Sequence, residues 1–358
     1  MEFLKHAGWH VDYLVENGQG DTSYIETAAL KGFRGVARVN GSHEGLPPSG
    51  DLDVFFRKRA YDLVVIQFWG IAQRYLPAIR RVSQGTRIMI ATIDLHFLRE
   101  FREESAARGA DEHAELREET GVRMVQELNT YAAADAVITV SEKETTLVED
   151  LLSGPGLTHY VPWIVDVPAS RVPVADRRGI LFVGNFTRAP NVTAVEYLFR
   201  EIVPYLSREM LQRHPIMLVG DGLDGSEGFL PRHPAVQVVG RVPDMTPYYQ
   251  AARVNLLPLL AGAGVKQKLL EASMAGTPSV STSIGIEGTG LEPGASVRVA
   301  DEPEEFARQI ELLTEDDSLW GNVAQGAQRQ VTGSHAPDVV RGRFLDVVDC
   351  VMGKPDRR

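Results

Sequence analysis

Short apolar runs alternate with segments of helical spacing along nearly the whole chain. Most runs are continuous and are not interrupted by polar residues, which is typical of strands covered on both faces. Between the runs, apolar positions form stripes, such as the one from Val192 to Leu206 in a helix expected to begin near Pro190. The strands that this pattern predicts are Val11–Val15, Gly35–Val39, Leu63–Phe68, Arg87–Ile93, Ala136–Val140, Ile180–Val183, Ile216–Val219, Val236–Val239, Val254–Leu257, Ser279–Thr282 and Val297–Val299.

Strands that alternate with helices imply parallel sheets with right-handed crossovers. A chain of 358 residues is longer than one hydrophobic core usually organises. We therefore predict an α/β protein with two doubly wound, Rossmann-like domains. Three prolines interrupt the chain before a new strand begins, so we place a hinge there. The resulting division is a first domain at 1–165, a hinge linker at 166–178, a second domain at 179–335 and a last helix at 336–358 that could cross back to the first domain.

The N-terminus departs from the usual order of such a domain. Phe3, Leu4 and Ala7 before Gly8 indicate the end of an amphipathic helix, and a strand follows at once. A doubly wound domain normally opens with a strand and a glycine-rich turn before its first helix, and neither is present. Two explanations stay open: the first domain is built without this strand, or the recorded start lies downstream of the natural one.

Composition narrows the class of protein. Hydrophobic residues make up 44% and charged residues 24%, as in ordinary globular domains. The net charge of −11 disfavours binding to nucleic acid or to an anionic membrane surface. Cys350 is the only cysteine, which excludes a disulfide framework and fits a reducing compartment. The chain has neither an apolar run of roughly 18 residues nor a signal-peptide pattern. We expect a cytoplasmic protein whose membrane association is at most peripheral.

The first candidate site follows the strand that ends at Val183. Gly184 and Asn185 form a turn, and Pro190 starts a helix. The N-terminus of such a helix offers free N–H groups and partial positive charge to an anion. Arg188 could add a full charge. The alternative is that Gly184 only turns the chain and that Arg188 is solvated.

The second candidate site is the segment from Leu259 to Pro278, which joins a strand to a glycine loop and a short helix. Gly262 and Gly264 allow a phosphate to approach backbone amides, and Lys266 and Lys268 add charge. Glu271 lies about one turn further along and can accept hydrogen bonds from a ribose diol. Glycines, cations and a carboxylate occur in the order that a nucleotide requires. The alternative is an exposed helix face with charge pairing.

The segment from Gly262 to Pro278 resembles the donor-site signature of retaining glycosyltransferase family 4, which has the GT-B fold. Phe182–Gly184 with Pro190–Asn191, and Gly240–Asp244 before Tyr248–Tyr249, resemble the flanking segments of this family. Tyr61–Gln67, Thr92–Arg99 and Ala133–Glu144 are less specific matches. The pattern is similar to the exopolysaccharide and O-antigen sugar transferases. The resemblance implies a nucleotide-sugar site in the second domain and an acceptor site in the first.

The chain also departs from the pattern of this family at several positions. The family's donor-ribose glutamate falls on Glu271, but the first glutamate of the E-x7-E pair falls on Ala263. The arginine and lysine that bind the diphosphate in this family are not in their usual spacing. We expect Arg188, Lys266 and Lys268 to take their place, and Lys266 is the first candidate. The donor-binding residues that we expect are Gly184, Asn185, Arg188, Gly262, Gly264, Val265, Lys268 and Glu271.

The third candidate is Asp94 with His96, after a strand of the first domain, where the family often has a histidine. Either side chain could orient a hydroxyl, so we name both, with Lys266, as candidate catalytic residues. Equally, Asp94 caps the next helix and His96 packs on it. Asp51-Leu52-Asp53 is interpreted as a helix start, not as a metal-binding pair. We expect no metal and no cofactor, because fixed cations can neutralise the leaving diphosphate.

With the family resemblance, these features lead us to expect a retaining glycosyltransferase that moves a sugar from a nucleotide-diphosphate sugar to a hydroxyl on a glycan, a lipid-linked acceptor or a small molecule. It would act in glycan or polysaccharide biosynthesis. Two alternatives stay open. One is a non-catalytic nucleotide-sugar-binding or scaffold protein, which Ala263 motivates. The other is a different GT-B enzyme acting on sugar nucleotides, such as an epimerase.

Overall fold

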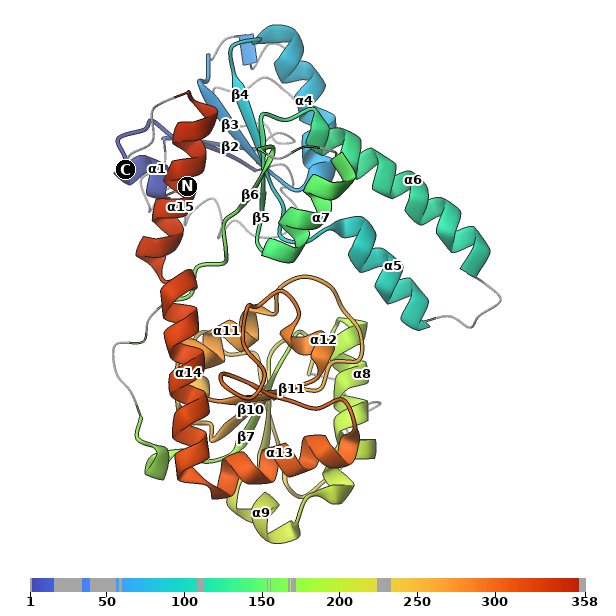
Figure 1. Cartoon of the computed structure of the whole chain (residues 1–358), viewed down its shortest axis with the longest axis vertical. Coiled ribbons are helices and arrows are strands. Elements are labelled where there is room, and N and C mark those ends of the chain that lie inside the picture. Colours follow the sequence, from blue (N-terminus) through green and yellow to red (C-terminus); the bar gives the residue numbers. More distant parts are fainter. Residues whose placement is uncertain are drawn as a thin grey trace.

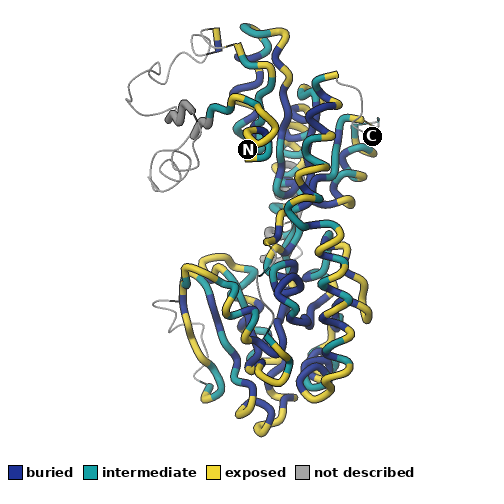
Figure 2. Tube along the Cα trace, turned by 90° about the vertical axis from the view of Figure 1, so that its left-hand side faces the viewer, coloured by how far each residue is buried: buried dark blue, intermediate teal, exposed yellow. Residues whose placement is uncertain are grey.

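The structure is a computed structural model that describes residues 2–15, 34–38, 56–57, 60–107, 113–152, 154, 156–166, 168, 172–223 and 233–353. The chain forms two α/β lobes, one above the other, each built on a parallel sheet flanked by helices (Figure 1). Along the chain trace, buried segments run through the middle of each lobe and exposed ones lie outside (Figure 2). The predicted fold class of two Rossmann-like domains is confirmed.

The N-terminal lobe contains a four-stranded parallel sheet in the order β3-β4-β5-β6. Its strands are β3 (Leu63–Gln67), β4 (Arg87–Ala91), β5 (Ala136–Thr139) and β6 (Thr158–Tyr160). The helices between and beside them are α4 (Trp69–Val82), α5 (His96–Ala107), α6 (His113–Ala132) and α7 (Glu142–Leu152). Before this sheet, α1 (Glu2–His6) precedes β1 (Asp12–Val15), which pairs in parallel with β2 (Arg34–Arg38).

The C-terminal lobe contains a six-stranded parallel sheet in the order β12-β11-β10-β7-β8-β9. Its strands are β7 (Ile180–Val183), β8 (Ile216–Val219), β9 (Val236–Gly240), β10 (Val254–Leu257), β11 (Ser279–Ser281) and β12 (Arg298–Val299). The helices are α8 (Ala189–Tyr197), α9 (Arg208–Arg213), α10 (Thr246–Ala251), α11 (Gln267–Met274), α12 (Ser283–Ile286), α13 (Pro303–Glu315) and α14 (Asp317–His335).

The central strands of this sheet are apolar on both faces because both faces are covered. Ile180, Leu181 and Phe182 of β7 are fully buried. Ile180 and Phe182 belong to the large core cluster on one side, whereas Leu181 packs with Tyr249 in a separate cluster. Continuous apolar runs are therefore what this sheet requires.

Two segments connect the lobes on the same side of the molecule. One runs from β6 through η2 (Val174–Asp176), and the other joins α14 to α15 (Pro337–Val351). Helix α14 packs in the C-terminal lobe, and α15 packs on the sheet of the N-terminal lobe (Figure 1). The segments are hydrogen-bonded to each other where they cross: Val165 N donates to the His335 carbonyl at 3.0 Å, and His335 Nδ1 lies 2.8 Å from the Trp163 carbonyl oxygen.

Local differences from the sequence prediction have physical causes. Strand β6 is not among the predicted strands because its three residues, between glycines and Pro162, give no apolar run. The helix expected near Pro190 begins at Ala189, but it passes into a π turn at Leu198–Ile202 and a 3-10 turn at Val203–Tyr205, where Pro204 interrupts helical hydrogen bonding. Asp51-Leu52-Asp53 lies outside the described residues.

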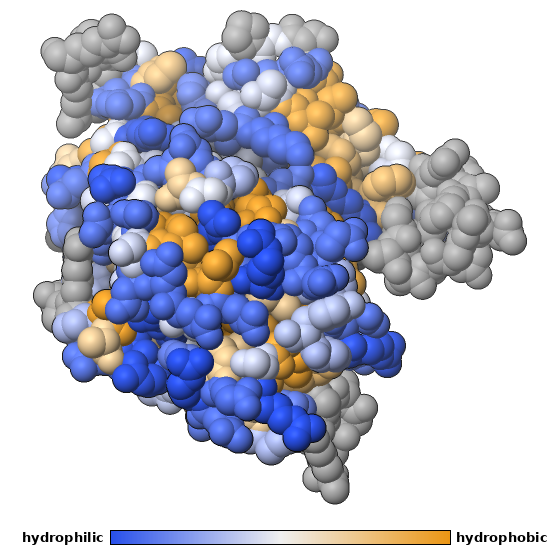
Figure 3. Space-filling view, turned by 60° about the horizontal axis from the view of Figure 1, so that its bottom comes forward, coloured by the Kyte–Doolittle hydropathy of each residue, from blue (hydrophilic) through white to orange (hydrophobic). Residues whose placement is uncertain are grey.

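Neither lobe contains, in its described residues, a helix long and apolar enough to cross a membrane. Viewed from the lower end of the C-terminal lobe, the surface is mostly hydrophilic, and apolar residues form smaller patches within it (Figure 3).

Candidate functional site

The two segments predicted to bind the donor meet at the switch point of the C-terminal sheet. Strand order reverses beside β7, which pairs with both β8 and β10. The chain leaves β7 toward Gly184, Asn185 and Arg188, and it leaves β10 toward Gly262–Val265. Ligands of doubly wound sheets bind in the crevice at this point, because the connections on its two sides run to opposite faces of the sheet. Topology thus brings together residues that are far apart in sequence.

The turn after β7 is held by the side chains of its own residues. Asn185 Oδ1 accepts a hydrogen bond from Thr187 N at 3.0 Å, and Asn191 Nδ2 donates to the Asn185 carbonyl at 2.9 Å. Arg188 is exposed and directly precedes α8. The turn therefore presents an arginine and the free N–H groups of a helix start at the sheet edge.

Gly220, at the end of β8, lies against this turn. Its φ is 141°, and a Cβ atom there would lie 1.8 Å from the Gly184 carbonyl oxygen. We expect Gly220→Ala to lower the free energy of unfolding by about 2 kcal/mol, because both the backbone conformation and the close approach exclude a side chain. Urea-induced unfolding measures this effect.

The matched control is Gly342→Ala, at a position in α15 where a Cβ atom meets nothing within 4 Å. Alanine there should be neutral or should stabilise the protein by up to about 1 kcal/mol, because it favours the helix. Equal effects of the two substitutions would contradict the tight fit at Gly220.

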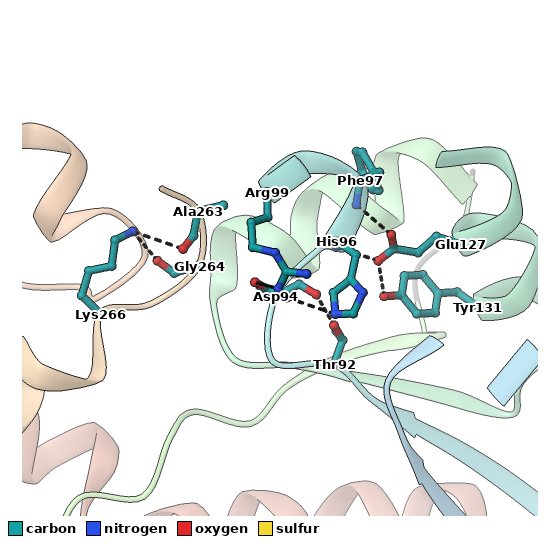
Figure 4. Close-up of polar contacts among 10 residues, drawn as sticks. All are labelled: Thr92, Asp94, His96, Phe97, Arg99, Glu127, Tyr131, Ala263, Gly264 and Lys266. Carbon is teal, nitrogen blue, oxygen red and sulfur yellow. Dashed lines mark hydrogen bonds and ion pairs between the residues drawn. The ribbon is translucent and has the colours of Figure 1, made fainter. Parts of the chain in front are cut away.

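The loop between β10 and α11 is shaped by two glycines with positive φ, 134° at Gly262 and 70° at Gly264. Lys266, immediately before α11, turns its ammonium group back onto this loop. Its Nζ donates to the carbonyl oxygens of Gly264 at 2.7 Å and Ala263 at 3.3 Å (Figure 4). Burial lowers the pKa of Lys266 to about 8. The side chain of Val265 is half-buried beside Gly288.

Lys268 joins the two donor-site segments. Its Nζ lies 2.8 Å from the Val183 carbonyl oxygen, 2.8 Å from Asn191 Oδ1 and 4.8 Å from the centroid of the Phe182 ring. Burial lowers the pKa of Lys268, and the charge of Lys266 lowers it further. Both ammonium groups therefore add positive charge to the same edge of the sheet.

Glu271 lies further along α11 and faces α10. Tyr249 Oη donates to Glu271 Oε2 at 2.9 Å, and Gln267 Nε2 donates to Oε1 at 2.9 Å. Burial raises the pKa of Glu271. The carboxylate is thus held in place by two neutral donors and can accept further hydrogen bonds through the remaining lone pairs of its oxygens.

In the N-terminal lobe, Asp94 and His96 lie just beyond β4. Arg99 Nη1 donates to Asp94 Oδ2 at 2.7 Å and to Oδ1 at 3.0 Å, and His96 Nε2 lies 3.4 Å from Asp94 Oδ1 (Figure 4). The carboxylate of Asp94 therefore pairs with side chains of α5 and does not cap that helix. His96 packs beside Phe68 and Trp69, and burial lowers its pKa, with Arg99 acting in the same direction.

Glu127 of α6 caps α5 from outside. Its Oε1 accepts a hydrogen bond from His96 N at 3.1 Å, and its Oε2 accepts one from Phe97 N at 2.9 Å (Figure 4). Tyr131 Oη donates to Glu127 Oε1 at 2.6 Å. Burial raises the pKa of Glu127. This carboxylate fixes the turn that carries Asp94 and His96.

The two lobes are in direct contact at these loops. A Cβ atom on Gly264 would lie 3.1 Å from the Cβ atom of Asp94, so the glycine loop rests on the N-terminal lobe. Nearby, Arg102 Nη2 donates to Glu287 Oε1 at 3.0 Å, and Lys143 pairs with the same carboxylate. Although burial opposes ionisation, the hydrogen bonds from Arg102 and Lys143 lower the pKa of Glu287 to about 2. Two cations of one lobe thus bind one anion of the other.

Comparisons with known proteins agree with this architecture. Residues 177–316 match the family described as glycosyl transferases group 1. An uncharacterized 44.6 kDa protein in the cps region of Klebsiella pneumoniae is 28% identical over 139 residues, which are 37% of this chain. The chain spans only 36% of the length of that relative.

Three solved structures are similar over almost the entire chain. Sucrose-phosphate synthase from Thermosynechococcus elongatus has a TM-score of 0.70 and 17% identity, and the match covers 98% of this chain and 91% of that one. For a glycosyltransferase from Rickettsia africae the TM-score is 0.70 and the identity 11%, with 99% of this chain and 93% of that one covered. For Anabaena HepE in complex with UDP-glucose the TM-score is 0.67 and the identity 15%, with 94% of this chain and 98% of that one covered. The fold is GT-B. At these identities the likeness establishes the fold alone.

The GT-B fold places the predicted residues in two groups. Gly264 meets Asp94 across the lobe interface, and Lys266 turns back onto the same glycine loop. Lys268 and Glu271 lie deeper in the C-terminal lobe and contact β7 and α10. Sequence reasoning did not single out several charged residues near the interface, among them Arg102, Glu127, Glu144 and Glu287. The only signal was for Glu144, which ends the segment Ala133–Glu144 noted above. The partners of the others are distant in sequence.

Proposed function

We propose that this chain is a retaining glycosyltransferase that transfers a sugar from a nucleotide-diphosphate donor to a hydroxyl acceptor in glycan or polysaccharide synthesis. The observation that carries the proposal is the approach of the glycine loop, onto which Lys266 turns its ammonium group, to the Asp94–His96 turn of the other lobe. One side offers cations and backbone amides to a diphosphate. The other side offers a carboxylate and an imidazole to hydroxyl groups.

In this reaction the acceptor oxygen bonds to the anomeric carbon on the face from which the diphosphate departs. The departing phosphate oxygen takes the proton of the acceptor, so no enzymic nucleophile is needed. Lys266, Lys268 and the N–H groups at the start of α11 stabilise the charge that develops on the diphosphate. These fixed cations are the reason that we propose a reaction without a metal ion.

The remaining residues have distinct proposed roles. Glu271, held by Tyr249 and Gln267, accepts hydrogen bonds from the ribose hydroxyls. Asp94 and His96 orient the hydroxyl groups of the acceptor or of the donor sugar. Gly184, Asn185 and Arg188 close the other side of the diphosphate site, and Val265 supports the loop. The protein would work in the cytoplasm, at most peripherally bound to a membrane.

Donor binding tests the proposal by calorimetry on a panel of nucleotide sugars. UDP-glucose comes first because HepE, with the same fold, is in complex with it. We expect binding of at least one donor and at least about tenfold weaker binding in Glu271→Ala and Lys266→Ala, because each substitution removes a charge-assisted hydrogen bond. Absence of binding by the parent chain, or unchanged binding in both variants, would refute the assignment.

Turnover separates an enzyme from a scaffold. With a bound donor identified, release of the nucleoside diphosphate in the presence of hydroxyl acceptors should exceed release in their absence, and NMR of the product should show the anomeric configuration of the donor. Donor affinity without turnover on any acceptor would support the scaffold alternative that Ala263 raises. An inverted product would exclude the retaining mechanism.

A further inference from the structure

Glu144 is a buried carboxylic acid that the proposed mechanism does not use. It lies in the first turn of α7, and only 4% of its surface is exposed. The carboxylate accepts a hydrogen bond from the backbone N–H of Leu95, but its Oε2 atom, also buried, has no hydrogen-bond partner. A buried polar atom without a partner is costly, and such atoms in native structures are few. The missing hydrogen-bond partner of Oε2 requires an explanation.

The position of Glu144 suggests one. It lines a cavity between the lobes, to which the N-terminal lobe contributes Arg102 and Ser141 and the C-terminal lobe contributes Gly264 and Glu287. The cavity has a volume of about 20 Å³, which is room for one water molecule or for one hydroxyl group of a larger ligand. Gly264 belongs to the glycine loop that Lys266 caps, so the cavity adjoins the proposed diphosphate site.

The charges around Glu144 favour a hydroxyl as its partner. Burial raises the pKa of Glu144 to about 7, and the carboxylate of Asp94 contributes to this shift. The charge of Lys266 lowers the pKa of Glu144, whereas the charge of Glu287 raises it. Glu287 itself is paired with Arg102 and Lys143. A carboxyl group near its pKa can accept or donate a hydrogen bond, and a sugar hydroxyl can also do both.

The glycine loop itself offers no acid for this purpose. No aspartate or glutamate occurs between Leu259 and Leu270, and Ala263 occupies the middle of the loop. Glu271 follows, but Tyr249 and Gln267 hold it on the side of α10. The unpartnered carboxyl oxygen next to the loop belongs to the opposite lobe.

We propose that Glu144 binds the transferred sugar: Oε2 hydrogen-bonds one hydroxyl of the donor sugar, which enters the cavity beside Gly264. The residue thereby supplies from the acceptor lobe the sugar contact that the donor loop lacks. This inference rests on the proposed function. In this proposal Glu144 determines the affinity for the sugar part of the donor. The lysines and Glu271 bind the nucleotide part.

Calorimetry with two ligands tests the role of Glu144. The ligands are UDP-glucose and UDP, or the best donor of the panel and its bare nucleotide. We expect Glu144→Leu to weaken binding of the nucleotide sugar about tenfold or more and to change binding of the bare nucleotide less than about twofold. Glu144→Gln keeps one acceptor oxygen and places an NH2 donor in place of the other oxygen, so it should restore part of the lost affinity. Glu142→Gln, an exposed neighbour in the same helical turn, should behave like the wild type.

The outcomes distinguish this inference from the proposed function. Failure of the wild type to bind either ligand would overturn the proposed function and the role of Glu144 with it. Wild-type binding of both ligands, with both affinities unchanged in Glu144→Leu, would leave the proposed function intact and refute the sugar contact. Equal weakening of both ligands would show that Glu144 only supports the backbone at Leu95, and it too would refute the contact.

Discussion

Replacing Lys266 with alanine is expected to reduce kcat by about 10²–10³-fold, because a fixed cation that stabilises leaving-group charge contributes that much to rate. In the structure the ammonium group of Lys266 donates only to carbonyl oxygens of its own loop. No carboxylate of a described residue lies within ion-pair distance of it, so it can turn to a diphosphate without breaking a salt bridge. Steady-state kinetics with the donor identified by calorimetry gives the comparison.

Lys266→Arg is the matched control, since it keeps the charge. With a pKa of about 8 in the free protein, Lys266 loses its charge as the pH rises above that value, so kcat/KM of the wild type should fall there. Arginine stays protonated, so the variant should lack the part of this decline that is centred near pH 8, whereas any part due to Lys268 should remain. A Lys266→Ala variant with nearly wild-type kcat would remove Lys266 from the mechanism.

The largest loss of stability is expected from Arg177→Met. Arg177 is 1% exposed and donates to the carbonyl oxygens of Val172 and Ala275 at 3.0 Å and to Thr277 Oγ1 at 2.6 Å. Its guanidinium group also lies 5.1 Å from the centroid of the Trp320 ring. Methionine would remove the donor of these hydrogen bonds, of which those to Ala275 and Thr277 are buried, so the free energy of unfolding should fall by about 3–5 kcal/mol.

Arg178→Met provides the control, because the neighbouring arginine is exposed and donates to carbonyl oxygens of its own segment. Its free energy of unfolding should change by less than about 1 kcal/mol. Urea-induced unfolding followed by circular dichroism measures both variants. A loss below about 1 kcal/mol in Arg177→Met would mean that water or rearranged side chains replace the buried hydrogen bonds.

The fold could be predicted because its central strands are covered on both faces. Burial on two sides forces continuous apolar runs, such as Ile180–Val183, and these are visible without any knowledge of partners. Edge elements give weaker signals. Strand β6 has three residues, with Thr158 buried and the other two partly exposed, so no run of apolar letters marks it.

The candidate site was predictable where its residues follow one another in the chain. Gly262, Gly264, Lys266 and Lys268 form one connected segment, and a loop before a helix has the same local geometry in many folds. Contacts between the lobes carry no such pattern. Arg102 and Glu287 are 185 positions apart, and nothing in either local sequence indicates that they pair. The burial of Glu144 likewise depends on the opposite lobe.

The hydrogen bonds between Val165 and His335, described with the fold, have a consequence for how substrates come and go. The two chain crossings are hydrogen-bonded to each other on one side of the molecule, so we expect the lobes to separate by rotation about that side. The ion pairs of Glu287 with Arg102 and Lys143 join the same two lobes at a second place. Opening of the lobes then requires these ion pairs to break. Added salt, which weakens exposed ion pairs, should speed this opening.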